Sequence, residues 1–494
     1  MNVLLLNMPV VFNSWQNLEM PLGVMYIAAQ LEREGYRVNI KDYEVERFEK
    51  SEFEKLISRF KPDVIGVSFR SSSYASAKKI CSLIKKMNPD IKIVLGGQHA
   101  SAFSQDTLKD ILADFVVRGE GEYIMAELLE ALSLRKNFSG VAGITYRHNG
   151  EIIENISRDN IDNLDGLDFP AWHLVPVEKY VTGSILTSRG CPFSCIYCDK
   201  GISTRKVRFR SPENIYNEII AFEKKYKKGR IYFVDDYFFL NKERLRQIFA
   251  FVLGNGGLKI RWVCQARVDG VNDVNFLRLA KKAGCDMIIY GVETGDIQEL
   301  EYINKKATLE DAGCAIKITK DAGIKTRVNF MIGFPISTIK MVGNSIRFAK
   351  KLNANLYRFF IVSPLPNTIL WDRVEKIYPD ISRVGWDKFD FYSASFDTAE
   401  ISKGDLVKYV LAAYIYVLKN RTMRELSIEL VFRLAKLLYL SIRVGKMRGN
   451  FSNAFPACVN LFLEGWQVSR HIERGKKLSY LKEAFAIAKR FKKC

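Results

Sequence analysis

Three closely spaced cysteines constrain this chain more than any other feature. They lie in the stretch Ser188-Arg189-Gly190-Cys191-Pro192-Phe193-Ser194-Cys195-Ile196-Tyr197-Cys198, with the spacing C-x3-C-x2-C. Glycine and proline predict a loop here, and a loop can turn three sulfur atoms onto one face of a metal cluster, whereas a helix or strand would point them apart. Three thiolates are one fewer than the four that usually hold an iron–sulfur cluster. One iron would therefore keep an open position for another ligand, as catalytic metal sites do.

A structural zinc site and a disulfide with one spare thiol are the alternatives for these cysteines. A zinc site needs a fourth Cys or His close by, and the next cysteine is Cys264. The other cysteines are scattered along the chain: Cys81, Cys264, Cys285, Cys314, Cys458 and Cys494. This scatter is not a disulfide framework and predicts a reducing cytoplasm. The sequence therefore favours a metal cluster.

The spacing resembles that of the radical S-adenosylmethionine (SAM) superfamily. Tyr197 before the last thiol and the strand-like Ile185-Leu186-Thr187 before the loop match as well. The resemblance implies a [4Fe–4S] cluster held by Cys191, Cys195 and Cys198, with SAM on the fourth iron and in contact with Tyr197. It also implies that an electron from the cluster cleaves SAM to a 5′-deoxyadenosyl radical.

Residues 1 to 135 alternate strand and helix. The predicted strands are Val3–Leu6, Arg37–Ile40, Asp63–Val67, Ile91–Leu95 and Asp114–Val117. This alternation predicts an α/β fold with a doubly wound, Rossmann-like parallel sheet, whose ligand lies beyond the carboxyl ends of the strands. Glycine and small polar residues follow those ends, so that the backbone can approach a large flat ligand closely.

These strand ends are similar to the cobalamin-binding domain that precedes the radical SAM domain in one large subgroup. The matching segments are Pro21-Leu22-Gly23, Gly66-Val67-Ser68, Gly96-Gly97-Gln98-His99 and Gly119-Glu120-Gly121-Glu122. The resemblance implies cobalamin contacts from Ser68, Gly96, Gly97, Gln98, Gly119 and Glu120. A generic flavodoxin-like domain for another ligand is the alternative.

If the domain binds cobalamin as the resemblance implies, we expect no motif histidine to be the cobalt ligand. The sequence lacks the Asp-x-His-x-x-Gly motif of other cobalamin domains. His99 is the one histidine on a candidate rim loop. A lone loop histidine is more often a hydrogen-bonded or solvated residue than a metal ligand, so we do not assign it to cobalt.

Residues 136 to 182 are predicted to form a connector that contains a hairpin with an Asn149-Gly150 turn. Strand–helix alternation resumes between residues 183 and 370. The predicted strands are the one before the cysteine loop, Arg230–Val234, Leu258–Val263, Asp286–Tyr290, Thr326–Met331 and Ala354–Phe360. Six parallel strands agree with the partial (β/α)6 barrel of radical SAM domains. In α/β barrels the chemistry lies at the carboxyl ends of the strands.

Three of these strand ends carry residues that the resemblance assigns to SAM. Asp235 and Asp236 follow the second strand, where many members have a Gly-Gly-Glu stretch that holds the amino group of SAM. Because adjacent strand residues point to opposite faces, only one of the two can face SAM directly, and both could instead cap the next helix. Arg267 could clamp the SAM carboxylate or a substrate anion. Glu293 is expected to accept hydrogen bonds from the ribose.

The chain is basic, with a formal charge of +20. From residue 421 to residue 494 we count sixteen Lys and Arg against five Asp and Glu. Residues 371 to 494 are predicted to form a helical cap over the barrel mouth, with helices at Leu406–Lys419, Arg424–Arg443, Phe455–Gln467 and Leu478–Lys493. A solvated helical face accounts for this charge, and contact with anionic lipid, nucleic acid or an acidic substrate is the alternative. No run of eighteen apolar residues and no signal peptide is found, which together with the cysteines predicts a cytoplasmic protein.

Together, these resemblances imply a cobalamin-dependent radical SAM enzyme and favour a class B methyltransferase. Its substrate would be a small or lipid-like molecule methylated at an unactivated carbon, and its electron donor a protein such as ferredoxin or flavodoxin. A radical SAM oxidative cyclase or rearrangement enzyme without methyl transfer is the first alternative.

The second alternative is a nucleic-acid- or membrane-binding protein with a redox-sensing cluster. The chain lacks aromatic-rich RNA-binding motifs, so we predict no nucleic-acid partner, whereas peripheral membrane contact through the basic C-terminal region stays a hypothesis. A tRNA methylthiotransferase would need a second cysteine trio in its N-terminal domain, which here has only Cys81.

Overall fold

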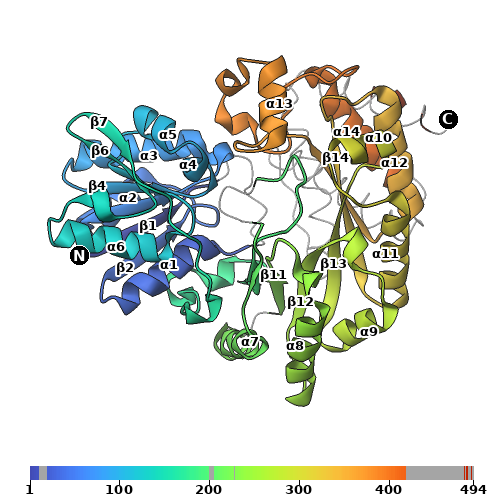
Figure 1. The fold of residues 1–494 in the computed structure, drawn as a ribbon, viewed down its shortest axis with the longest axis horizontal. Coiled ribbons are helices and arrows are strands. Elements are labelled where there is room, and N and C mark those ends of the chain that lie inside the picture. Colours follow the sequence, from blue (N-terminus) through green and yellow to red (C-terminus); the bar gives the residue numbers. More distant parts are fainter. Residues whose placement is uncertain are drawn as a thin grey trace, which may run out of the picture. The chain divides into compact units, whose positions relative to one another are not determined.

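The computed structural model describes residues 1–9, 19–199, 205–226 and 229–418, together with residues 483, 486, 487 and 491. The chain divides into two compact units (Figure 1). The first unit contains Met1–Ala266, Asn275–Asp286 and Pro364–Asp390, and the second contains Arg267–Val274, Met287–Ser363 and Phe391–Cys494. The boundaries of the four predicted domains stay predictions.

A seven-stranded sheet forms the N-terminal part of the first unit, in the order β2-β1-β3-β4-β5-β6-β7. Its strands are β1 (Asn2–Asn7), β2 (Arg37–Asp42), β3 (Val64–Ser68), β4 (Lys92–Gly96), β5 (Phe115–Val117), β6 (Ile144–His148) and β7 (Glu151–Glu154). Strands β1 to β5 pair in parallel. The order 2-1-3-4-5 is that of a doubly wound sheet, so this prediction is confirmed for the first five strands.

Helices pack against this sheet, in which β1, β3, β4 and β5 are mostly apolar and β2, β6 and β7 mix apolar with polar residues. They are α1 (Leu22–Arg33), α2 (Lys50–Phe60), α3 (Tyr74–Met87), α4 (Gln98–Ala102), α5 (Ser104–Asp110) and α6 (Gly121–Ser133). One core cluster joins Leu4 and Ile65 of the strands to Phe53 of α2 and Ile80 of α3. α1 and α6 pack against each other. Burial on both faces explains why β1, β3, β4 and β5 are near-continuous hydrophobic runs.

The predicted hairpin is confirmed, and it belongs to this sheet. Asn149 and Gly150 have φ values of 50° and 87°, the left-handed pair that a tight two-residue hairpin turn requires. β6 also pairs antiparallel with β5, and β7 with β6, so the hairpin extends the sheet beyond its parallel strands.

Six strands form the second sheet, in which their order is their order along the chain. They are β8 (Gly183–Ile185), β11 (Arg230–Phe233), β12 (Arg261–Arg267), β13 (Cys285–Glu293), β14 (Lys325–Ile332) and β15 (Leu356–Ile361). In the first unit β11 pairs in parallel with β8 and β12, and in the second unit β14 pairs in parallel with β13 and β15. This topology confirms the predicted (β/α)6 organisation.

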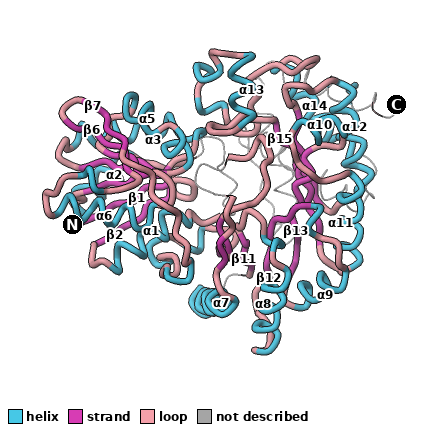
Figure 2. The backbone as a smooth tube through the Cα atoms, viewed as in Figure 1, coloured by secondary structure: helices cyan, strands magenta, loops and turns pink. Residues whose placement is uncertain are grey.

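The helices of this region follow their strands as predicted (Figure 2). They are α7 (Pro212–Tyr226), α8 (Lys242–Gly254), α9 (Val274–Lys282), α10 (Ile297–Tyr302), α11 (Leu309–Asp321), α12 (Ile339–Leu352), α13 (Ile369–Ile377) and α14 (Lys403–Leu418). Local capping signals in the sequence mark where two of these helices begin. The Ser211 hydroxyl accepts from the backbone N–H of Asn214 ahead of α7, and Thr308 forms a capping box with Asp311 at the start of α11.

One predicted strand begins too early. The apolar residues Leu258 and Ile260 predicted a strand from residue 258, but β12 begins at Arg261. Gly256 and Gly257 have φ values of 85° and 81°, and a bend at Lys259 and Ile260 separates them from the strand. Of the predicted C-terminal helices, the first is confirmed as α14, and the next two lie outside the described residues. The last, Leu478–Lys493, also lies outside them except at residues 483, 486, 487 and 491. None of the described helices combines the length and apolarity that a membrane span needs.

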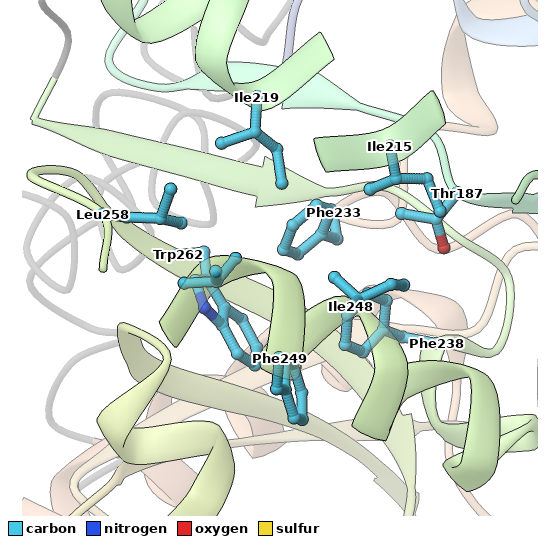
Figure 3. Close-up of a pocket in the computed structure, with 10 residues that line it drawn as sticks. Thr187, Ile215, Ile219, Phe233, Phe238, Ile248, Phe249, Leu258 and Trp262 are labelled. Atoms are coloured by element: carbon cyan, nitrogen blue, oxygen red, sulfur yellow. The ribbon is translucent and has the colours of Figure 1, made fainter. Parts of the chain in front are cut away.

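A small apolar cavity lies between helices α7 and α8 and strands β11 and β12 (Figure 3). Ile215 and Ile219 of α7 line one side, and the rings of Phe233, Phe249 and Trp262 line the other. The last two rings stack with centroids 5.7 Å apart. Almost every lining group is apolar, so we interpret this cavity as a packing gap in the core and not as a binding site.

The close contact between β8 and α7 gives a first prediction. A Cβ added at Gly183 would lie 2.4 Å from ring carbons of Phe222. Gly183→Ala should therefore push α7 away from β8 and lower the free energy of unfolding by about 1–3 kcal/mol. Urea denaturation of both proteins measures the difference.

Gly229→Ala is the matched control, because nothing lies within 4 Å of its added Cβ. The double variant Gly183→Ala/Phe222→Leu should recover part of the loss. A Gly183→Ala protein as stable as the parent would contradict this account of the packing.

Candidate active site

The cysteine loop leaves the carboxyl end of β8 through a short hairpin. Strand β9 (Ser188–Arg189) pairs antiparallel with β10 (Arg208–Phe209), so the two ends of the loop are joined at its base. Gly190 has a φ of 99°, which glycine adopts without steric cost, and it turns the chain just before Cys191. The loop therefore follows the first strand of the barrel, as predicted.

The three cysteines lie outside the core while their neighbour is anchored in it. All three are thiols; Cys191 and Cys195 are half-buried and Cys198 is exposed. The backbone N–H of Cys198 donates to the carbonyl of Cys195 at 3.3 Å, which makes a tight turn. Within this turn Ile196 is 3% exposed, and its carbonyl accepts from the N–H of Leu370 at 2.9 Å. Burial of one side chain thus holds the turn and leaves its sulfurs accessible.

The donor set of the loop fits an iron–sulfur cluster. Over the described ranges, no three Cys, His, Asp or Glu side chains are gathered as a metal-ion site, the loop thiols included. Three accessible thiols on one loop are the ligands that iron–sulfur clusters prefer, and they leave one iron position for SAM. The residues present are therefore compatible with the predicted cluster.

Asp235 and Asp236 have different environments. Asp235 is 1% exposed, and its Oδ1 accepts from the backbone N–H and hydroxyl of Thr187 at 2.9 and 3.0 Å and from the hydroxyl of Ser188 at 2.7 Å. Burial raises the pKa of Asp235, and the charge of Arg244 opposes that rise. Asp236 is exposed. The first carboxylate therefore ties the end of β11 to the base of the cysteine loop, and the second points out of the core.

Arg244 is a member of this site that sequence reasoning missed. Its Nη1 donates to the carbonyls of Thr187 and Arg210, both at 3.1 Å, and its Nη2 donates to the Thr187 hydroxyl at 2.9 Å. Its guanidinium carbon lies 4.8 Å from the ring centroid of Phe209. Arg244 belongs to the first turn of α8, where nothing in the local sequence distinguishes it from a solvated helix residue.

In the second unit, Glu293 and Arg267 meet through Lys305. The Lys305 ammonium donates to Oε1 of Glu293 at 2.8 Å, and Arg267 donates to the Lys305 carbonyl at 2.5 Å. Arg267 also holds the Asp269 carboxylate with two bonds of 2.9 and 2.7 Å. Glu293 has a φ of 69° beside a β-bulge, a conformation that costs energy and tends to occur at functional sites. The structure thus brings two predicted residues together and adds Lys305 and Asp269 to them.

The predicted cobalamin residues lie at or just after the carboxyl ends of parallel strands in the first sheet. We call this set the rim: Ser68, Gly96, Gly97, Gln98, Gly119 and Glu120. Ser68 and Gly96 end neighbouring parallel strands and are in register. A Cβ added at Gly96 would meet nothing nearer than 3.9 Å, and one added at Gly119 would meet nothing within 4 Å. The backbone is therefore open there, which fits a large flat ligand such as a corrin ring.

Gly97 and Gln98 complete this rim. Gly97 has a φ of 95°, and a Cβ added there would lie 2.5 Å from the carbonyl oxygen of Phe69, so glycine is needed for the two strand ends to approach. Gln98 begins α4 and is exposed. Both residues therefore shape or line the rim.

The side chain of Glu120 is buried and hydrogen-bonded to other residues of the protein. It accepts two hydrogen bonds from Arg208 and one from the N–H of Ile161. Burial by itself raises the pKa of Glu120, but the bonds from Arg208 and the charge of Arg189 hold it below its usual value. The predicted contact of Glu120 with cobalamin would therefore be made by its backbone, and it stays a prediction.

His99 is a buried, hydrogen-bonded residue. It is 2% exposed, and its Nδ1 lies 2.9 Å from the Ser71 hydroxyl. Its ring centroid is 4.8 Å from that of Tyr74 and 4.6 Å from that of Trp386. Trp386 belongs to the segment that follows the last barrel strand. This segment therefore packs beside the carboxyl ends of the strands in the first sheet.

Comparison with known proteins identifies the family. The B12 binding domain matches residues 8–129, and the radical SAM superfamily matches residues 185–349. An uncharacterized methyltransferase of Pyrococcus horikoshii is 33% identical over 359 residues, which cover 71% of this chain and 78% of that protein. The chain belongs to the cobalamin-binding radical SAM enzymes.

Other relatives of this cobalamin-binding radical SAM enzyme differ in their named activity. The anaerobic magnesium-protoporphyrin IX monomethyl ester cyclase of Rubrivivax gelatinosus is 26% identical over 419 residues, which cover 82% of this chain and 75% of the cyclase. The solved structure of OxsB with aqua-cobalamin and SAM bound has a TM-score of 0.71 and 18% identity, over 100% of this chain and 83% of OxsB. At that identity the likeness is one of fold.

Family membership confirms the predicted fold class and the three predicted cofactors, a [4Fe–4S] cluster, SAM and cobalamin. The cysteine loop and the glycine rim each lie within the matching domain. A radical SAM enzyme also needs a reductant, as predicted. The individual SAM and cobalamin contacts stay predictions.

Burial of His99 predicts a pH effect on the stability of this cobalamin-binding radical SAM enzyme. Burial lowers the pKa of His99 from 6.5 to about 4. The unfolded chain takes up a proton near pH 6.5 while the folded chain resists it, so stability should fall as the pH drops through this window, by up to about 3 kcal/mol. Urea denaturation at pH 7 and pH 4.5 measures the loss.

His99→Asn is the matched variant, because an amide can keep the bond to Ser71 without titrating. We expect this variant to lose less stability than the parent between the two pH values. An identical loss in both proteins would show that His99 does not contribute.

Proposed function

We propose that this enzyme is a methyltransferase that adds a methyl group to an unactivated carbon of a small or lipid-like substrate. One observation carries the proposal: a single chain combines a three-thiol loop at the end of β8 with an open glycine rim on a sheet of the B12-binding type. The first feature suits the generation of a radical, and the second suits the carriage of a methyl group. The 33% identical relative named as a methyltransferase supports this assignment.

The chain itself supplies ligands, orientation and shielding. Cys191, Cys195 and Cys198 would hold the cluster, and the rim from Ser68 to Gly119 would hold cobalamin. When bound, these cofactors and SAM together supply reductive cleavage of SAM, hydrogen abstraction from the substrate and a methyl group.

Asp236 is the proposed partner of the SAM amino group. Asp235 is committed to Thr187 and Ser188 at the base of the loop, whereas Asp236 is the exposed carboxylate that follows it. A carboxylate that meets an ammonium makes a charge-assisted hydrogen bond. We propose further SAM contacts from Tyr197, Arg267 and Glu293.

An oxidative cyclase is the second candidate. The cyclase of Rubrivivax gelatinosus is related to this chain over 82% of its length, although at the lower identity of 26%. Both candidates need the same cofactor-binding parts, and they differ in whether the product gains a methyl group.

We propose a ferredoxin or flavodoxin as the electron donor and the cytoplasm as the compartment. Contact with a membrane would involve the basic C-terminal region, most of which lies outside the described residues. We propose no nucleic-acid partner.

Replacing Cys195 tests the cluster assignment. Cys195→Ala should remove one of three iron ligands, so the protein purified without oxygen should lose its brown colour, most of its iron and its formation of 5′-deoxyadenosine. Iron analysis and chromatography of the nucleoside measure these losses. Cys314→Ala, at an exposed cysteine of α11, is the control and should keep all three. Cleavage of SAM by Cys195→Ala would refute the site.

The same pair of proteins tests methyl transfer. Cells that produce the parent or Cys195→Ala are fed methionine with a deuterated methyl group, and their small molecules and lipids are compared by mass spectrometry. A compound that carries the labelled methyl group only with the parent supports a methyltransferase. A parent-specific product without the label would favour the cyclase.

Replacing Asp236 tests the SAM contact. Asp236→Asn removes the charge that would meet the ammonium, and we expect about 10- to 100-fold weaker SAM binding, the effect of losing a charged hydrogen bond of about 1.5–3 kcal/mol. Equilibrium binding to the cluster-loaded protein measures it. Asp90→Asn, at an exposed turn before β4, is the control. Unchanged affinity with an unchanged iron content would exclude Asp236.

A further inference from the structure

Two arginines face each other across the base of the cysteine loop. Arg189 of β9 and Arg208 of β10 are direct partners in the antiparallel register. Only 13% and 3% of their side-chain surfaces are exposed. Like charges directly opposite each other destabilise a strand pair, and burial adds the cost of desolvating both. The hairpin that carries the loop therefore needs counter-charges from elsewhere in the fold.

The counter-charges come from the start of α6, the helix that follows β5 of the N-terminal sheet. Glu120 accepts from both terminal nitrogens of Arg208 at 2.8 Å, and Nη1 of Arg189 lies 3.3 Å from the same carboxylate. Glu122, in the first turn of α6, accepts from Nη2 of Arg189 at 2.6 Å. Both carboxylates are 4% exposed. Two buried cations are thus balanced by two buried anions.

Other contacts hold this four-residue network in place. Arg208 also donates to the carbonyl of Ile161 at 2.7 Å, and the N–H of Ile161 donates to Glu120 at 2.7 Å. The Arg189 guanidinium lies 5.4 Å from the ring centroid of Tyr26 on α1. The base of the loop is therefore fixed by elements of the N-terminal sheet and not by its own hairpin alone.

We propose that Arg189, Arg208, Glu120 and Glu122 form a positioning network that makes the conformation of the cysteine loop depend on the state of the cobalamin rim. Arg189 is two residues before the first cysteine ligand, and Glu120 directly follows Gly119 of the rim. A movement of the rim when a corrinoid binds moves Glu120 and Glu122, and their bonds to the arginines carry that movement to the loop.

The consequence is a reciprocal coupling between the two cofactors. If corrinoid binding favours the loop conformation that holds the cluster, the cluster must strengthen corrinoid binding by the same factor. This inference rests on the family's cofactors and not on methyl transfer, so it stands whether the product is methylated or cyclised.

The test compares the affinity for hydroxocobalamin with and without the cluster. The full-length protein is titrated anaerobically, either stripped of iron or reconstituted with iron and sulfide, and binding is followed by absorbance. For the parent we expect the ratio of the two dissociation constants to be about fivefold or more, the lower range of measured couplings. A parent ratio of one would overturn the proposal.

Two variants test whether the network carries the coupling. Glu122→Gln leaves Arg189 without its full counter-charge, and Arg189→Gln/Glu122→Gln removes both charges and leaves no buried charge uncompensated. We expect both ratios to approach one while the double variant keeps the circular dichroism of the parent. Glu127→Gln, also on α6 but paired with the partly exposed Arg158, is the control and should keep the parent ratio.

A purely structural role would give a different result. A double variant that keeps the parent ratio would overturn the proposal, because the coupling would then run through other residues. A double variant that fails to fold would also overturn it, because the network would then be a requirement of the fold and not a positioning device.

Discussion

The compensation of buried charge at the base of the cysteine loop is the constraint on which the rest of the site depends. Four arginines lie there with little or no exposure: Arg189, Arg208, Arg210 and Arg244. A buried cation without a partner costs several kcal/mol, so each must meet carboxylates or carbonyls. Their carboxylate neighbours come from α6, α7 and the end of β11: Glu120, Glu122, Glu218 and Asp235. The base of the loop is therefore held by residues from several elements that are far apart in the sequence.

The residues of this site fall into two groups. Some are buried and hold the backbone in place, and others are exposed or half-buried. Asp235 and Asp236 are adjacent and identical, yet one is buried among hydroxyl groups and the other is exposed. Ile196 is buried, and the cysteines that flank it are not. In each case strand or turn geometry sends neighbouring side chains in opposite directions, so that one anchors the backbone and the next is presented. A rigid support of this kind is what a precise catalytic arrangement requires.

The cofactor-binding parts do not by themselves decide the reaction. A relative named as a methyltransferase and another named as a cyclase both align with most of this chain. Functions that differ on one fold are set by the residues that contact the substrate. In the second unit, Lys305 joins Glu293 and Arg267, which end β13 and β12, into one connected set of charges. The carboxyl ends of barrel strands are where residues that contact ligands are expected.

The sequence by itself determined the three-thiol loop, the alternation of strands and helices in two parallel sheets, and the hairpin turn. These features depend on local patterns: cysteine spacing, apolar runs, the Asn149-Gly150 turn, and capping residues such as Thr308. Only the tertiary structure decided that Asp235 is an anchor, that Glu120 turns inward, that Lys305 joins Glu293, and that Arg208 and Arg244 belong to the site. Ion pairs and hydrogen bonds between residues far apart in sequence leave no local pattern, because they depend on which elements pack together. The same reason explains why His99, on a rim loop in the sequence, is buried against Trp386 in the fold.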